Sequence, residues 1–287
     1  MARIWDQSNL HAWCVVPFDT SKRDSEARAA MLAELGIRRF AYDWRAEHTP
    51  EFPEELRALE AHGIDLLAWW WGWEAGDPTG QATLELFKAH GLTPRLWVAQ
   101  NWEQAAQDAM PTTDEEQAHR VEREATRVSD IAQWAAPYGC RVDLYNHNDW
   151  FGLVENQLAV RQRAEDLGAV GVGLTYNFSH AKDALHDDTV EFAAVWAKIQ
   201  PYVTVVNLSG THVDDGMTLL PGDGERELEM MRIIEASGWR GPIGIIAEYG
   251  GDAKEVLQVC RDRVAWLVRE LDEPASGGPK PAAPAHG

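Results

Sequence analysis

The 287-residue sequence lacks the features that mark membrane, secreted and redox-active proteins. It has no run of eighteen apolar residues, which excludes a transmembrane helix. Residues 1–18 have no basic start followed by an apolar stretch, so we expect no secretory signal peptide. The three cysteines, Cys14, Cys140 and Cys260, are odd in number and form no CxxC pair. We therefore expect buried thiols in a protein of the reducing cytoplasm.

Basic residues are scarce. Asp and Glu outnumber Lys and Arg by 46 to 26, which gives a net charge of −20, and the sequence has no basic run or stripe. Proteins that bind nucleic acid or anionic membranes gain affinity from clustered positive charge. We therefore expect neither partner, and a small carbohydrate-like, largely neutral ligand is the better prediction.

Glycine-rich phosphate loops are missing as well. Neither GxGxxG nor GxxxxGK[ST] occurs, so we expect no nucleotide cofactor. Their absence also counts against a doubly wound open sheet, the runner-up fold, because such a sheet normally carries a glycine-rich loop after an early strand.

The sequence does contain a regular alternation of short apolar runs with longer amphipathic segments. Four glycines, Gly36, Gly63, Gly91 and Gly238, stand where a helical segment gives way to an apolar run, a place that favours glycine. The eight strand candidates are residues 12–19, 38–45, 64–73, 93–101, 140–148, 170–179, 203–210 and 242–251. Helical patterns include residues 25–35, 54–62, 114–136, 155–167, 189–199 and 225–237.

Strands alternating with helices indicate parallel pairing through right-handed crossovers. We predict a single α/β domain over residues 1–271, a (β/α)₈ TIM barrel, a fold that typically takes about 250 residues. Residues 272–287 are rich in Pro, Gly and Ala, and we expect them to form a disordered tail. The sequence is compatible with a homo-oligomer.

Catalytic residues of such barrels come from the carboxyl ends of the strands. Side chains alternate along a strand, so outward Val172 and Leu174 imply inward neighbours, and the same alternation applies to the other strands. The resulting candidates for substrate contact are Asp43, Arg45, Trp70, Trp97, Tyr145, Asn146, Asn177 and Asn207. An isolated acid or Arg at a strand end can also be a loop anchor, and Asp43 and Arg45 could pair with each other.

Three further candidates carry the chemistry. Glu248 ends the apolar run PIGIIAE, and a carboxylate there needs a cation, a metal or a set of hydrogen bonds. His147 and His180 each follow a strand. We predict these three as the catalytic residues.

Tryptophan is abundant, with 14 residues. Indole rings stack on the apolar faces of sugars, although core filling explains many of them equally well. The cluster WWWGW at residues 69–73 cannot lie wholly in the core, because alternation directs its neighbours to opposite sides. Nine tryptophans fall on predicted strands or just after them: Trp13, Trp44, Trp69, Trp70, Trp71, Trp73, Trp97, Trp102 and Trp150.

Three segments resemble the xylose-isomerase-like superfamily of sugar isomerases and epimerases, over nearly the whole chain up to residue 271. GDGERELEMMRIIEASGWRGPIGIIAEYGG (222–251) resembles the family's GxGE, helix, and strand-ending-in-Glu passage. GLTYNFSHA (173–181) is similar to its Asp-x-x-His segment, and LYNHNDW (144–150) to its strand ending in Glu-Asn-His. The related AP-endonuclease family is a poorer match, because it needs a multi-metal cluster and a DNA-binding face.

The resemblance implies a divalent metal (Mn, Mg or Zn) held by two Glu, an Asp and a His. Of these ligands, Glu248 and His180 are present, whereas Tyr145, Asn177 and Asn207 stand where the family has two acids and a seventh-strand His. Hard cations prefer carboxylate oxygen, so this set is weak. A rearranged site of His147, His180 and Glu248, with an open position, is one alternative, and no tight metal is the other.

The leading hypothesis is an isomerase or epimerase that moves a proton next to a sugar carbonyl, with Glu248 as base and a histidine as acid. β-Elimination on a keto-glycoside starts with the same step. A sugar-binding barrel that has lost its metal and its chemistry is the hypothesis of a different class.

Overall fold

The structure, a computed structural model, describes residues 3–101, 110–147, 149–181, 191–211 and 218–284. Its eight strands pair in parallel in chain order, and β8 pairs with β1 to close a barrel, which confirms the predicted (β/α)₈ fold. The strands are β1 (Leu10–Trp13), β2 (Arg39–Tyr42), β3 (Asp65–Trp70), β4 (Arg95–Val98), β5 (Arg141–Tyr145), β6 (Gly173–Asn177), β7 (Val203–Leu208) and β8 (Ile243–Ile246).

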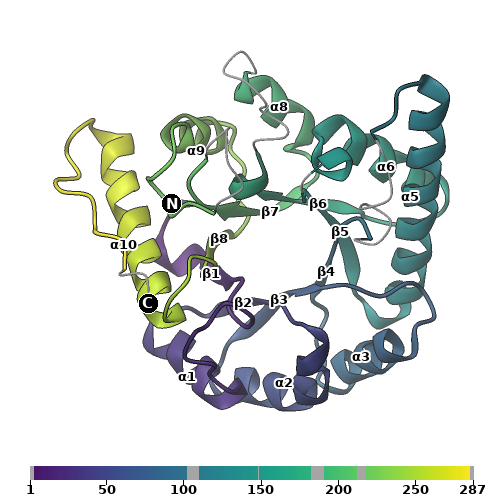
Figure 1. Ribbon diagram of the computed structural model, residues 1–287, viewed down its shortest axis with the longest axis horizontal. Coiled ribbons are helices and arrows are strands. Elements are labelled where there is room, and N and C mark those ends of the chain that lie inside the picture. The colour runs from purple at the N-terminus through teal and green to yellow at the C-terminus, as the bar shows by residue number, and fades with distance from the viewer. Residues whose placement is uncertain (1–2, 102–109, 148, 182–190, 212–217, 285–287) are drawn as a thin grey trace.

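Helices surround the ring of strands, as Figure 1 shows. The described α-helices are α1 (Ser25–Glu34), α2 (Phe52–Ala61), α3 (Pro78–Ala89), α5 (Asp114–Ala135), α6 (Val154–Asp166), α8 (Phe192–Ile199), α9 (Glu227–Ala236) and α10 (Ala253–Asp272). Short 3₁₀ turns are η1 (Gln7–Asn9), η2 (Ala46–Glu51), η3 (Ala136–Tyr138), η4 (Asp149–Gly152) and η5 (Phe178–His180). None of the described helices combines the length and apolar character that a membrane span requires.

The helix ends follow from the sequence. Asp24 accepts the N–H of Ala27 at the start of α1, and Thr113 with Glu116 forms a capping box on α5. The four glycines predicted at helix-to-strand joints have φ between 63° and 79°, the left-handed region that glycine tolerates.

Alternation along the strands separates two cores. Trp69 and Trp71 pack outward against the helices, whereas Trp70 between them packs inside the barrel. The inner cluster is small, because the barrel interior holds few side chains per strand. It consists of Trp13, Cys14, Ala41, Ala68, Trp97, Tyr145, Val205 and Ile246, with Phe18, Leu67 and Trp70 packed against it.

A polar layer lies below this cluster. The buried carboxylate of Asp143 accepts hydrogen bonds from Arg95 Nε at 2.9 Å and from Thr204 Oγ1 at 2.6 Å. A Cβ at Gly173 would come within 2.2 Å of the same carboxylate, so only glycine fits beside it. Its partners on β4 and β7 give Asp143 a structural role.

The predicted first strand begins two residues too late, at residue 12, whereas β1 begins at Leu10. The earlier start places His11 in the barrel interior, fully buried, where burial lowers its pKa to about 3.

The segment after α10 runs back against the barrel. The indole N–H of Trp266 donates to the carbonyl of Gly278 at 3.0 Å, and Lys280 pairs with Asp223 at 2.6 Å. The domain boundary at residue 271 and the disorder expected for residues 272–287 stay predictions.

Candidate active site

A cavity of about 580 Å³ opens at the carboxyl ends of the strands, the end of the barrel that the sequence indicates. Most of its lining residues lie at strand ends or in the loops that follow them. They are Trp13, Cys14, Phe18, Asp43, Trp44, Arg45, Ala46, Trp70, Gly72, Tyr145, His147, Ser179, His180, Thr218 and Glu248. The structure therefore brings seven of the eleven predicted site residues together around one space.

Glu248 stands two residues beyond β8, with the Cys14 thiol and the Arg45 guanidinium nearby. Burial raises the pKa of the Glu248 carboxyl, and the opposing effects of Arg45 and Cys14 are smaller. A carboxylate with a raised pKa holds a proton more readily than a surface glutamate. This property suits a general base that must take up and return a proton.

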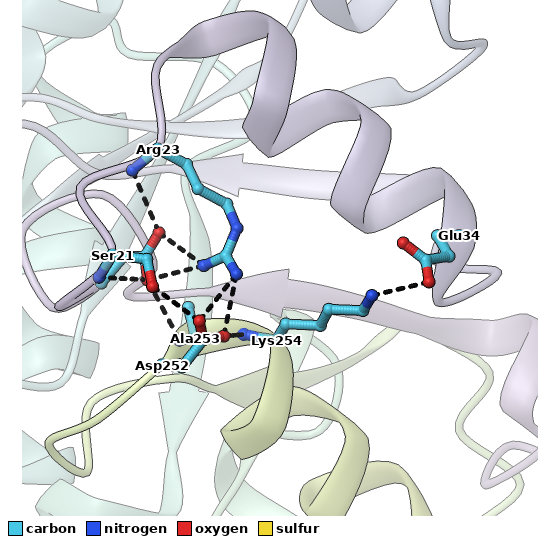
Figure 2. A network of polar contacts seen from close by, with 7 residues as sticks. Ser21, Arg23, Glu34, Asp252, Ala253 and Lys254 are labelled. Carbon is cyan, nitrogen blue, oxygen red and sulfur yellow. Dashed lines mark hydrogen bonds and ion pairs between the residues drawn. The ribbon is translucent and has the colours of Figure 1, made fainter. Parts of the chain in front are cut away.

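The loop that carries Glu248 is fixed to the loop after β1 by a network of ion pairs (Figure 2). Arg23 pairs with Asp19 at 2.8 Å and with Asp252 at 2.7 Å. Asp19 also accepts the N–H of Ala253, the first residue of α10, at 3.1 Å. Because Asp19 is buried, this network holds the two loops in one arrangement. The sequence gives no indication of it, since Asp252 and Ala253 are more than 200 residues from Asp19 and Arg23.

His147 and His180 lie together, with their ring centroids 4.4 Å apart. His147 follows β5, and His180 ends η5 directly after β6. Burial lowers the pKa of His147 to about 4, and Asp149 opposes this only in part. The imidazole of His147 is therefore neutral at pH 7, so it can exchange hydrogen bonds without carrying a positive charge.

Tyr145 forms the floor of the cavity. Its hydroxyl accepts a hydrogen bond from Trp13 Nε1 at 2.9 Å and a second one from Asn177 Nδ2. Burial raises the Tyr145 pKa well above its ordinary value, so the hydroxyl keeps its proton. Asn177 Oδ1 in turn accepts the N–H and Oγ–H of Ser179 at 3.0 and 2.7 Å.

Four predicted site residues lie behind the lining. Asn177 and Asn146 join the ends of β6 and β5, because Asn146 Oδ1 accepts the Asn177 N–H at 2.7 Å. Trp97 packs edge-on beneath Trp13, with centroids 4.6 Å apart. Asn207 is fully buried near Tyr145 and His11. Through these contacts the four residues support the floor on which a ligand would rest.

An aromatic wall stands on the β2–β3 side. Trp70, at the end of β3, faces the ring of Tyr145 edge-on at 5.2 Å. Trp44 lies parallel to Trp73 at 4.4 Å and donates its indole N–H to the Trp70 carbonyl at 2.7 Å. Arg45 extends over the Phe18 ring at 5.7 Å and makes no direct ion pair with Asp43 in the described structure. Trp102 lies outside the described residues.

Cys14 and Phe18 line the cavity, although the sequence marked neither as a site residue. Cys14 follows inward-pointing Trp13, and simple alternation would turn it outward. Its φ of 53° breaks the alternation. Nothing in the sequence indicates a left-handed residue there, because such conformations favour glycine or asparagine.

The donor set does not suit a divalent cation. The oxygens of Tyr145 and Asn177, at two positions where the resemblance places ligand acids, already accept hydrogen bonds from Trp13, Asn177 and Ser179. Within the described ranges, no group of three His, Cys, Asp or Glu side chains lies close enough together to hold a metal ion. The predicted set of His147, His180 and Glu248 does not form such a group in the described structure.

No protein-family model matches the chain, and no curated protein is similar to it in sequence at a significant level. Solved structures do match. A D-tagatose 3-epimerase-like protein superposes with a TM-score of 0.66 at 13% identity, covering 93% of this chain and 99% of its own. The 3-keto-D-glucoside 4-epimerase of E. coli superposes with a TM-score of 0.64 at 16% identity, covering 91% of this chain and 99% of its own. A xylose isomerase domain protein of Alicyclobacillus acidocaldarius superposes with a TM-score of 0.62 at 19% identity, covering 92% of this chain and 98% of its own.

These similarities establish the fold. The chain has the fold of the xylose-isomerase-like TIM barrels and sugar epimerases, as the sequence motifs predict. At such identities a shared fold does not by itself carry a shared activity.

Proposed function

We propose that the protein is an enzyme that acts on a small carbohydrate or keto-sugar by moving a proton on the carbon next to a carbonyl group. Isomerisation or epimerisation is the reaction we favour. The observation that carries the proposal is the partly buried Glu248 carboxylate, which lines one cavity together with neutral His147 and an aromatic wall. The solved structures with the same fold include a keto-glucoside epimerase and other sugar epimerases, which supports the same choice.

In this proposal Glu248 is the base. A proton next to a carbonyl is removed by a positioned carboxylate, and such general-base assistance contributes roughly 10²- to 10⁴-fold. His147 and His180 face hydroxyl groups of the sugar, and Trp70 provides a ring on which its apolar face stacks. Tyr145 and Arg45 orient further hydroxyl groups.

β-Elimination on a keto-glycoside is a second candidate, favoured by one observation. A neighbouring cavity of about 710 Å³ shares Phe18 and Arg45 with the first. A sugar in the first cavity would leave room in the second for the group on its anomeric carbon. Elimination begins with the same proton removal and then expels that group.

The test is solvent exchange in D₂O, followed by NMR, with D-fructose, D-tagatose and methyl 3-keto-D-glucopyranoside as probes. The expected result is deuterium on the carbon next to the carbonyl, with an epimer or isomer as product. Release of methanol from the glycoside would select elimination instead. We expect Glu248→Gln to lower the exchange rate at least about 100-fold.

The matched control is Glu115→Gln, an exposed acid in the first turn of α5 that lines neither cavity. It should leave exchange unchanged. Full exchange in the Glu248→Gln variant would refute the assigned base. Calorimetric binding of a sugar with no exchange by the wild type would show a binding protein rather than an enzyme.

A further inference from the structure

The carboxyl group of Asp43 is held by one oxygen only. Asp43 follows β2 directly, is 2% exposed and lines the cavity. Its Oδ1 accepts the backbone N–H groups of Val15 at 3.1 Å and of Val16 at 3.3 Å. Its Oδ2 is also buried and has no hydrogen-bond partner among the described residues. Leaving a buried polar atom without a partner costs roughly 1–3 kcal/mol, so a free oxygen beside a ligand cavity is a sign of function.

The turn at Cys14 produces this arrangement. With φ at 53°, Cys14 directs the next two N–H groups to the same side, a small concave anion site of the kind formed by turns. A non-glycine residue in this conformation costs about 1–2 kcal/mol, and such strain gathers at functional sites. The Cys14 thiol also contacts Glu248. One turn after β1 therefore positions two acids, Asp43 from the β2 side and Glu248 from the β8 side.

The groups around Asp43 allow it to hold a proton. Burial raises the pKa of Asp43 to about 6, and the effects of Arg45 and the two backbone N–H groups are smaller. Of the neighbours, the thiol of Cys14 and the phenol of Tyr42 are neutral, because burial raises the pKa of both. The charge of Arg28 is compensated by Glu55 at 2.7 Å, and Arg45 remains as the nearby cation.

Removal of a proton next to a carbonyl needs an acid as well as a base, because negative charge develops on the carbonyl oxygen. His147 cannot supply it as a cation near neutral pH, since its pKa is about 4. Asp43 is a carboxyl group in the same cavity with one oxygen free.

We infer that Asp43 is a second catalytic residue, which gives a proton from Oδ2 to the sugar's carbonyl oxygen while Glu248 removes the proton from the adjacent carbon. The inference rests on the proposed function. The C–H bond breaks and Glu248 gains its proton. The electron pair forms the C=C bond of an enediol, and the carbonyl π electrons take the Asp43 proton. To complete an isomerisation, Glu248 then gives its proton to the former carbonyl carbon, and Asp43 recovers a proton from the hydroxyl oxygen on the adjacent carbon. The C=C electrons form the new C–H bond and the O–H electrons form the new C=O bond, so the carbonyl moves by one carbon with no net change in either acid.

The first test needs no substrate. The amide N–H groups of Val15 and Val16 report on Asp43, because both donate to its carboxylate. In a pH titration followed by ¹H–¹⁵N NMR, we expect both amide signals to move together with a midpoint near 6, and this transition to be absent in Asp43→Asn. A midpoint near 4, the ordinary value for an aspartate, would overturn the inference.

The second test uses the keto-sugar on which the wild type catalyses exchange. Asparagine keeps the shape of Asp43 and can still form a hydrogen bond with a carbonyl oxygen, but it cannot transfer a proton. We expect Asp43→Asn to lower kcat for exchange at least 100-fold with KM changed less than threefold. In the wild type, exchange should fall as pH rises above about 6, where Asp43 loses its proton.

The outcomes separate the two proposals. If Asp43→Asn exchanges within threefold of the wild type and of the Glu115→Gln control, the role of Asp43 is refuted while the proposed function stands. If the wild type exchanges no probe, the proposed function fails, and the role of Asp43 fails with it.

Discussion

The indole N–H of Trp13 donates a 2.9 Å hydrogen bond to the hydroxyl of Tyr145, across the barrel from β1 to β5. Both side chains are 2% exposed. Asn177 on β6 donates to the same hydroxyl, so that one oxygen connects three strands. This bridge separates the cavity from the barrel interior. It also places a tyrosine, whose hydroxyl already accepts two hydrogen bonds, where the family resemblance would have a ligand carboxylate.

Removing the hydroxyl tests the bridge. We expect Tyr145→Phe to lower the free energy of unfolding by about 1–3 kcal/mol, because the buried donors of Trp13 and Asn177 both lose their acceptor. The measurement is urea denaturation. The control is Tyr138→Phe, whose hydroxyl contacts Glu85 at the surface, where water can replace it. Equal losses of unfolding free energy in the two variants would show that the hydrogen bonds to the Tyr145 hydroxyl do not stabilise the fold.

Replacing the neutral groups with acids tests the reason that the cavity does not suit a metal. We expect the double substitution of Tyr145→Glu and Asn177→Asp to create a Mn²⁺ site with Glu248 and His180, since hard cations bind carboxylate oxygen. Calorimetry should detect Mn²⁺ binding by this variant and none by the wild type. The control, Tyr145→Gln, has similar size but no charge, and should not bind. Stoichiometric binding by the wild type would contradict the argument from its donor set.

The fold could be predicted from the sequence because its pattern repeats. Each of the eight strands lies within, or at the edge of, an apolar run followed by a helical segment, and the errors are confined to the ends. The alternation of side chains also placed Asp43, Tyr145 and Glu248 on the inner side, because carboxyl ends of parallel strands meet at one rim.

Depth along the barrel could not be predicted in this way. Asn207 and Trp97 point inward, but Tyr145 and Trp13 lie above them and form the floor. Whether an inward side chain reaches the cavity depends on the size and stagger of its neighbours on other strands. The left-handed turn at Cys14 and the contacts of Arg23 depend likewise on segments far apart in the sequence.

The Arg23 network of Figure 2 should contribute more to the free energy of unfolding than an exposed ion pair does. Arg23→Gln leaves the buried Asp19 without its cation, and removal of one partner of a buried pair costs about 3–5 kcal/mol. Because Arg23 itself is partly exposed, we expect Arg23→Gln to lower the free energy of unfolding, measured by urea denaturation, by about 1–3 kcal/mol. The control is Arg163→Gln, whose pair with Glu122 is exposed and should be worth less than about 1 kcal/mol. A loss no larger than that of the control would show that the two loops are held by other contacts.

Asp43 should also make the stability of the protein depend on pH. Burial raises its pKa from 3.8 to about 6, so the folded state binds this proton more tightly than the unfolded state. Below about pH 4 both states are protonated and the group costs nothing. As pH rises from 4 to 6 the unfolded state loses its proton first, and the wild type loses stability.

Asp43→Asn has no such proton. We therefore expect its free energy of unfolding, relative to the wild type, to increase between pH 4 and pH 7 by up to about 2 kcal/mol. The measurement is urea denaturation of both proteins at a series of pH values. The stability of the Glu115→Gln control should vary with pH in parallel with that of the wild type, because an exposed carboxyl is solvated in both the folded and the unfolded state. A constant difference between Asp43→Asn and the wild type would mean that the cavity solvates Asp43 fully, and that its free oxygen is not held ready for a ligand.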